Sequence, residues 1–171
     1  MGILRPYTHY SKAFIERQAN VLLQQMESTP FAPTWPLESA SVADFLDLGV
    51  VWDCIPPDGA GDIAARILPT QRMIEINETI LDMSQGFIES TLSHEIGHWV
   101  LHIDGDAVDA EDLEDEDEPF VCRGATDEGQ LAYEFASTEW QAQHFAACLL
   151  MPQFVLQQKL RWRRSDRWPD H

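Results

Sequence analysis

The sequence predicts an α+β fold in which a small three-stranded sheet packs against two helices. Three observations lead to this prediction. Apolar residues recur with helical spacing near both ends of the chain, short runs rich in β-branched residues lie between them, and no segment repeats. Strands flanked by helices in this way are typical of α+β layers. A chain of 171 residues corresponds to one domain, which is large enough to fold without disulfides.

The first part of the chain predicts two helices separated by a connector. Residues 11–27 carry apolar side chains at helical spacing, and Ser11 precedes them as a suitable N-cap. Residues 28–41 contain three prolines and are expected to form an irregular connector. Residues 41–49 predict a short helix that Gly49 closes.

The three strands are predicted within residues 50–77. The run VVWDCI, residues 50–55, combines β-branched and aromatic side chains and predicts a buried strand. A turn, PPDGAG, follows it at residues 56–61. Residues 62–77 alternate between polar and apolar side chains, which predicts two further strands joined near Pro69 and Thr70.

The chain is strongly acidic, with a formal net charge of -18 at pH 7. This charge disfavours general affinity for nucleic acids. Residues 104–118, DGDAVDAEDLEDEDE, consist mostly of carboxylates and are expected to form a solvated, mobile loop. Asp109 occupies the position at which an EF-hand calcium loop needs glycine, so calcium is not the expected ligand. We therefore treat residues 104–128 as an acidic loop insertion.

Residues 157–171 differ from the rest of the chain because arginines and tryptophans are interleaved in them. This composition also occurs in nucleic-acid-binding segments. We interpret the segment instead as a basic C-terminal tail that continues from the end of a helix, where positive charge offsets the helix dipole. No direct binding to nucleic acid is expected.

Cysteine usage and hydropathy indicate a cytoplasmic protein. Cys54, Cys122 and Cys148 are odd in number and form no CxxC pair, which indicates neither a disulfide framework nor a thiolate zinc site. No segment approaches the ~20 apolar residues that cross a membrane, and the first residues lack the apolar core of a signal peptide. No membrane partner is expected, and the sequence leaves the oligomeric state open.

The most informative segment is STLSHEIGHWVLH, residues 90–102, in a helix predicted from about Ser84 to His102. His94, Glu95 and His98 form an HExxH pattern. Residues four apart lie one helical turn above each other, so both imidazoles can bind one zinc ion, with Glu95 beside it as a general base. Apolar residues occupy another face of the helix, which suits packing: Ile88, Leu92, Ile96, Trp99 and Ile103.

His102 continues the four-residue spacing but is not expected to bind the same ion. At a rise of about 1.5 Å per residue it lies about 12 Å from His94 along the helix axis. We interpret His102 as a structural residue or as one that supports a ligand from behind.

The third ligand must come from another segment, because a catalytic zinc ion has three protein ligands and one open position. Residues 137–152, STEWQAQHFAACLLMP, predict a second helix between a capping box at Thr138 and Gln141 and the helix-ending Pro152. Glu139 would then lie in the first turn, where the helix dipole favours an ionised carboxylate.

Other candidates for the third ligand remain open at this point. Glu134 and the acidic insertion offer competing carboxylates. His144 lies too far around the helix to share a metal ion with Glu139 and is interpreted as a surface or interhelical residue. Ala142, Ala146 and Ala147 would allow this helix to approach a neighbour closely.

The two segments together, HEIGHWVLH and EWQAQHFAACLLMP, resemble the ImmA/IrrE family of metallopeptidases. The similarity covers roughly residues 11–156 and includes the strand that ends in MIEIN. Two departures from the family pattern stand out. The acidic insertion lengthens the link between the motifs, and Gln143 occupies a position often filled by asparagine or aspartate.

The resemblance implies a minimal gluzincin-like zincin fold with a single metallopeptidase domain, residues 1–156. It assigns zinc to His94, His98 and Glu139, and the role of catalytic base to Glu95. The implied activity is cleavage of one cytoplasmic protein, a helix-turn-helix repressor, which relieves repression of transcription under stress. Tyr133 is one candidate for stabilising the oxyanion. The alternative is a non-catalytic, zinc-containing regulatory or antitoxin-like module that acts by binding a protein.

Overall fold

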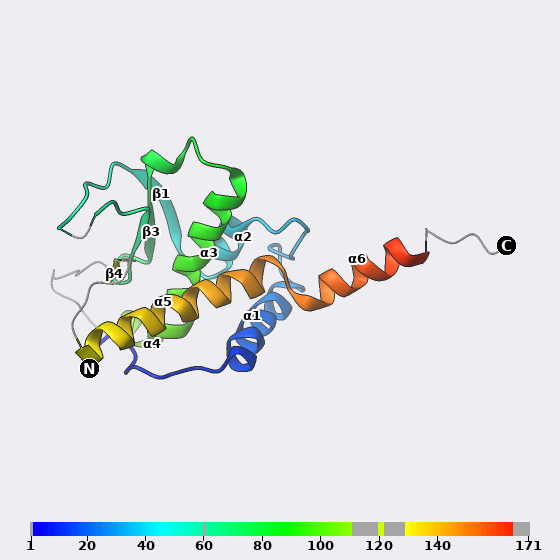
Figure 1. Cartoon of the computed structure of the whole chain (residues 1–171), viewed down its shortest axis with the longest axis horizontal. Coiled ribbons are helices and arrows are strands. Elements are labelled where there is room, and N and C mark those ends of the chain that lie inside the picture. The colour runs from blue at the N-terminus through cyan, green and yellow to red at the C-terminus, as the bar shows by residue number, and fades with distance from the viewer. Residues whose placement is uncertain (1, 60, 111–119, 122–128, 166–171) are drawn as a thin grey trace.

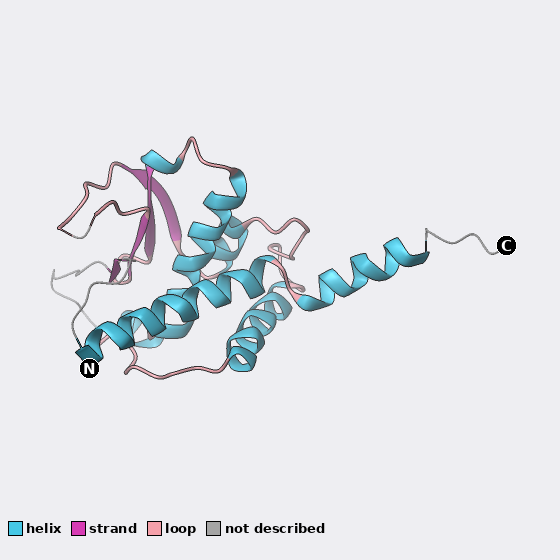
Figure 2. Ribbon diagram, viewed as in Figure 1, coloured by secondary structure: helices cyan, strands magenta, loops and turns pink. Residues whose placement is uncertain are grey.

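The protein is described by a computed structural model that covers residues 2–59, 61–110, 120–121 and 129–165. It confirms a mixed α+β architecture (Figures 1 and 2). The elements are, in chain order, α1 (Lys12–Met26), α2 (Ser39–Phe45), β1 (Gly49–Asp53), β2 (Ala65–Leu68), β3 (Met73–Asn77), the 3-10 helix η1 (Glu78–Ile80), α3 (Gln85–His102), α4 (Gly105–Ala110), β4 (Phe120–Val121), α5 (Gly129–Leu150) and α6 (Gln153–Ser165).

The predicted strands form one sheet of order β1-β3-β2-β4. β2 and β3 are the predicted hairpin, and β1 runs parallel to β3. The sheet differs from the prediction in having a fourth, two-residue strand, β4, which pairs with β2 and comes from the predicted acidic insertion. The prediction that the VVWDCI run is a buried strand was wrong: β1 is an edge strand, and Trp52 is 39% exposed.

The helix that carries the histidines lies between the sheet and α5 (Figure 1). α3 packs against β2 and β3 on one side and against α5 on another, and α1 also packs against α5. Side chains from all these elements form one core, including Ile15, Ile67, Ile74, Ile96, Phe145 and Leu149. Of the predicted apolar face of α3, Leu92, Ile96, Trp99 and Ile103 are buried.

Helix boundaries agree with the prediction where a side chain caps the helix. The hydroxyl groups of Ser11 and Ser84 each accept a hydrogen bond from the backbone amide three residues further along the chain. They are the N-caps of α1 and α3. The prediction for the second helix was wrong at both ends. α2 begins earlier, at Ser39, and it ends before Asp47, whose positive φ of 56° makes the turn, so that Gly49 already belongs to β1.

The acidic segment is not wholly a loop, contrary to the prediction. Its first part forms α4, in which Val108 is buried in the core and anchors the helix. Arg72 offsets part of the negative charge, because its guanidinium contacts the Asp109 carboxylate at 2.9 Å. The rest of the segment that was predicted to be mobile, residues 111–118, lies outside the described part of the chain.

The two C-terminal helices also differ from the prediction. α5 starts at Gly129, so Thr138 does not begin it and Glu139 lies in its interior. The predicted boundary of the basic tail at residue 157 falls within α6, which projects from the body of the molecule (Figure 1). Among the helices of the described residues, none combines the length and apolarity needed to cross a bilayer.

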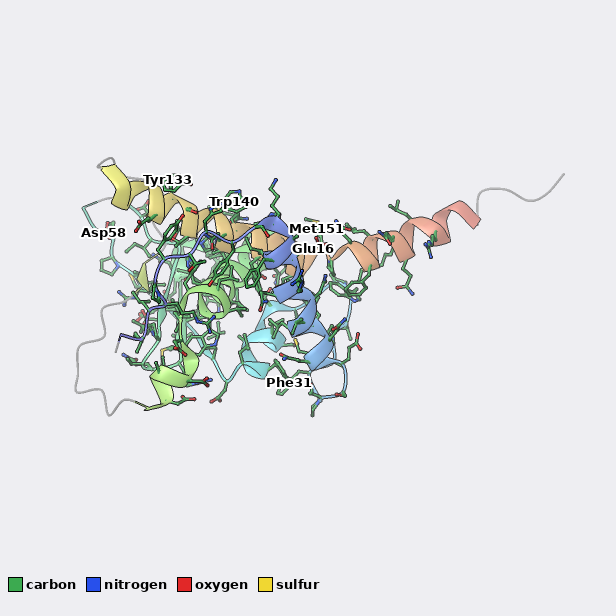
Figure 3. All side chains as sticks on the ribbon, turned by 90° about the horizontal axis from the view of Figure 1, so that it is seen from below. Glu16, Phe31, Asp58, Tyr133, Trp140 and Met151 are labelled. Atoms are coloured by element: carbon green, nitrogen blue, oxygen red, sulfur yellow. The ribbon has the colours of Figure 1, made fainter. Side chains whose placement is uncertain are left out.

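An N-terminal strap, residues 4–9, precedes α1 and runs along α3 and α5 (Figure 3). Leu4 forms a β-bridge with Ile103, and the amide of Arg5 donates to the carbonyl oxygen of His102 at 2.9 Å. The hydroxyl of Tyr7 lies 3.0 Å from the hydroxyl of Ser137 on α5. The strap therefore joins the C-terminal end of α3 to the middle of α5.

Candidate metal centre

Three predicted ligands, His94, His98 and Glu139, meet where α3 and α5 cross. The two Nε2 atoms lie 3.1 Å apart, and they lie 3.2 and 3.3 Å from the two carboxylate oxygens of Glu139. Among the residues that the structure describes, this is the one group of three or more histidine, cysteine or acidic side chains with metal-binding spacing.

The spacing of the three donors fits a tetrahedral metal ion. Metal–ligand bonds of about 2.0–2.1 Å separate neighbouring donors in a tetrahedron by about 3.3–3.4 Å. The two nitrogens lie 3.1 Å apart, and each lies 3.2 or 3.3 Å from a different oxygen of Glu139, distances that are close to that edge length. Two imidazole nitrogens and one carboxylate are also a donor set that zinc accepts. The residues present therefore fit a divalent ion of this kind.

The side chains behind the ligands direct their lone pairs into the cluster. Nδ1 of His94 lies 3.2 Å from the Oε1 atom of Gln143, and Nδ1 of His98 lies 3.0 Å from Nδ1 of His102. An amide oxygen only accepts, so Nδ1 of His94 carries the proton and Nε2 is left as a ligand atom. Gln143 thus orients His94, a role that was not predicted from the sequence.

In the metal-free protein the imidazoles of His94 and His98 stabilise the ionised form of the Glu139 carboxylate. Burial raises the pKa of Glu139, but the hydrogen bonds and charges of His94 and His98 outweigh it and lower that pKa to about 2. The ionised carboxylate therefore owes its charge to the imidazoles of α3, and not to a helix N-terminus as the sequence predicted.

The two imidazoles respond in opposite directions. Burial lowers the pKa of His94, but the hydrogen bond to Glu139 and the charges of Glu95 and Glu139 raise it above the ordinary value. Burial dominates at His98 and lowers its pKa. Of the two imidazoles, His94 is therefore the one that keeps a proton to higher pH. Burial and the charge of His98 lower the pKa of His102 to about 4, so His102 is neutral at pH 7.

This protonation pattern predicts how metal affinity depends on pH. Zinc binding requires neutral His94, whose pKa in the metal-free protein lies above the ordinary 6.5. Affinity should be nearly constant above that pKa and fall about tenfold per pH unit below it, because each bound ion displaces one proton. Competition titrations with a zinc chelator between about pH 5 and pH 8 measure this slope. Constant affinity across that range would contradict the assignment of His94 as a ligand.

Glu95, the predicted base, is buried on the same helix turn, with 1% of its surface exposed. Its negative charge contributes to the raised pKa of His94, the residue that precedes it in the chain. The cluster opens to solvent on the side of His94 and Glu139, whose side chains are 13% and 19% exposed, whereas His98 is fully buried. Solvent therefore reaches the cluster from that side.

Gly97 allows the two ligand-bearing helices to approach each other. A Cβ atom at Gly97 would lie 2.9 Å from the carbonyl oxygen of Ala142 and 3.3 Å from the ring of Phe145. Of the small residues predicted to permit close helix packing, Ala142 and Ala146 are fully buried here and Ala147 is half-buried. The spacing between His98 and Glu139 thus depends on the absence of a side chain between the two histidines.

Gly97→Ala should therefore separate α3 from α5. Overpacking of this kind destabilises a protein by about 1–3 kcal/mol, and the shift of Glu139 should weaken zinc binding as well. Thermal unfolding and zinc titration measure both effects. Gly86→Ala is the matched control on the same helix, because a Cβ atom at Gly86 meets nothing within 4 Å. Equal zinc affinity in both variants would show that the helix spacing does not control the site.

The remaining candidates do not join the cluster. His144 stacks on Trp140, with ring centroids 5.4 Å apart, and Tyr133 on the same helix is 63% exposed (Figure 3). Glu134 is half-buried and does not belong to the group with metal-binding spacing. Sequence reasoning missed Gln141, which is fully buried next to His102. Its signal was a polar residue on the face of the helix that carries Ala142 and Phe145.

No protein-family model matches the chain, and no curated protein matches it either. The resemblance to the ImmA/IrrE family therefore depends on its two motifs, and the site geometry is the evidence from which function is inferred.

Proposed function

We propose that the protein is a zinc-dependent endopeptidase of the ImmA/IrrE type with a minimal gluzincin-like fold. The observation that carries this proposal is the meeting of His94, His98 and Glu139 beside the buried carboxylate of Glu95. Two separate helices bring these groups together. An HExxH pattern that arose by chance would not be expected to have a third ligand beside its two histidines.

The residues divide the chemistry among them. Zinc held by the three ligands would supply a Lewis acid that polarises a peptide carbonyl and acidifies water. Glu95 accepts the proton of the attacking water and returns it to the nitrogen of the leaving amine. His94 and Glu139 are partly exposed, and a peptide substrate would lie on that side of the site.

The number of ligands favours catalysis over the alternative of a non-catalytic zinc module. Structural zinc sites are usually closed by four protein ligands, whereas catalytic sites keep one position open. Within the described part of the chain, the group has three members. A buried carboxylate at Glu95 also has no purpose in a purely structural site.

The substrate that we propose is a cytoplasmic helix-turn-helix repressor. This follows from the family resemblance, and the net charge of -18 is consistent with it. The DNA-binding surface of such a repressor is basic, and opposite charges speed encounter between two proteins. The acidic protease would therefore meet such a substrate faster at low salt.

Incubation of the zinc-loaded protein with a purified repressor encoded beside it tests the proposal. We expect cleavage at a defined site, detected by mass spectrometry of the fragments, and loss of cleavage when a chelator removes the metal. Stoichiometric binding of the repressor without cleavage would instead support the non-catalytic module.

A further inference from the structure

A relay of buried polar side chains leads from the ligand His98 to the N-terminal strap. Nδ1 of His98 lies 3.0 Å from Nδ1 of His102, and Nε2 of His102 lies 3.3 Å from Oε1 of Gln141. The amide nitrogen of Gln141 donates to the carbonyl oxygen of Thr8 at 3.1 Å. His98 and Gln141 are fully buried and His102 nearly so. His98 and Gln141 are therefore shielded from solvent, while His102 and Thr8 also line a cavity beside the strap.

The hydrogen bonds of the relay all point the same way, because each acceptor fixes the position of the next proton, beginning at Thr8. The carbonyl oxygen of Thr8 only accepts, so the NH₂ group of Gln141 faces the strap and its oxygen faces His102. That oxygen also only accepts, which places the His102 proton on Nε2. Nδ1 of His102 is then the acceptor for Nδ1–H of His98, and Nε2 of His98 keeps its lone pair for the metal ion.

The outer end of the relay is held at several points. Ser137 lies one helical turn before Gln141, and its hydroxyl accepts from Gln141 at 3.3 Å and from the hydroxyl of Tyr7 at 3.0 Å. Nδ1 of His9 lies 3.4 Å from the same hydroxyl oxygen. Together with the backbone bond between Arg5 and His102, these contacts fix the carbonyl group of Thr8 relative to α5.

We propose that Gln141 and His102 are positioning residues for the metal ligand His98, and that the strap belongs to the metal site by fixing their proton positions. The inference rests on the metal-binding part of the proposed function, and does not require peptidase activity. Partners behind a ligating histidine commonly set its tautomer and orientation. Here that partner is a second histidine, whose Nδ1 accepts the hydrogen bond of His98 when its own proton is on Nε2, the tautomer that the oxygen of Gln141 stabilises.

Zinc affinity of the full chain tests the proposal through two variants of Gln141. Gln141→Leu removes the acceptor for His102 and should lower zinc affinity by about 10–100-fold, the usual effect of losing such a partner. Gln141→Glu keeps an acceptor for His102 but loses the donor to Thr8, so it should retain most of the affinity and unfold at a lower temperature. Zinc affinity of Gln141→Leu equal to that of the wild type would overturn the proposal.

Asn77→Leu is the control for general destabilisation. The side-chain nitrogen of buried Asn77 donates to the carbonyl oxygens of Ile55 and Ile63, both at 2.8 Å, and Asn77 takes no part in the relay. This variant should lower the unfolding temperature and leave zinc affinity unchanged. An equal loss of zinc affinity in Asn77→Leu and Gln141→Leu would reduce Gln141 to a structural role and overturn the proposal.

The tautomer of His102 provides a direct readout in the wild type. With ¹⁵N-labelled histidine and bound zinc, long-range proton–nitrogen spectra should show His102 protonated at Nε2 and unprotonated at Nδ1. Protonation at Nδ1 would overturn the relay. Absence of peptidase activity in the same sample would contradict the proposed function and leave this result intact, so the two failures are distinguishable.

Discussion

Glu95→Gln should lower the rate of substrate cleavage by about 10²–10⁴-fold, the range expected when a general base is removed, while the protein still binds one zinc ion. Glutamine has nearly the same shape as glutamate, so the buried site remains filled. Its amide cannot accept a proton from water. The fold should be unaffected, because a neutral group replaces a carboxylate that is almost completely buried.

Cleavage of the repressor, zinc content and thermal unfolding should be measured on the same preparation of Glu95→Gln. Glu95→Asp is a useful companion, because it keeps the base but draws it back by one methylene group, and should retain part of the activity. Undiminished cleavage by Glu95→Gln would exclude Glu95 as the base and with it the proposed mechanism.

Glu139→Gln should lower zinc affinity by more than the 10–100-fold that loss of an outer partner costs, and should abolish cleavage. The substitution replaces a charged donor with a neutral amide at a position facing both imidazoles. It also removes the charge that raises the pKa of His94. The pH below which zinc binding weakens should therefore move downward in the variant.

Glu134→Gln on the same helix is the matched control. Glu134 is a half-buried carboxylate that competed as a candidate ligand in the sequence but does not join the cluster. The Glu134→Gln variant should bind zinc as tightly as the wild type. Loss of zinc binding in Glu134→Gln with unchanged binding in Glu139→Gln would show that Glu134, and not Glu139, is the third ligand.

The sequence predicted those parts of the fold whose determinants are local. The caps at Ser11 and Ser84 and the alternation within residues 62–77 act between near neighbours, and α1, α3 and the β2–β3 hairpin are found where they were expected. HExxH is likewise local, because both histidines lie on one helix. The pairing of these histidines with Glu139 came from the family resemblance rather than from spacing.

The errors arose where distant contacts override local signals. Thr138 has the pattern of a helix start, yet α5 continues through it from Gly129, and the side chain of Gln141 contacts the strap and not the backbone of Thr138. The apolar residues of β1 suggested burial, but strand order leaves β1 at an edge. The acidic composition around Val108 concealed the one apolar side chain that anchors α4.

The polar relay behind His98 could not be predicted from the sequence. It joins Thr8, His102 and Gln141, which are separated by up to 133 positions along the chain. Single glutamines and histidines have many structural roles, and only the packing of the strap against α5 gives these a common direction.

Anomalous diffraction at the zinc absorption edge, from crystals of the zinc-loaded protein, tests the central claim most directly. We expect a single strong peak between α3 and α5, about 2.0–2.2 Å from Nε2 of His94, Nε2 of His98 and a carboxylate oxygen of Glu139. A peak bound elsewhere, or Glu139 turned away from the two imidazoles, would contradict the metal site and the proposed peptidase function with it.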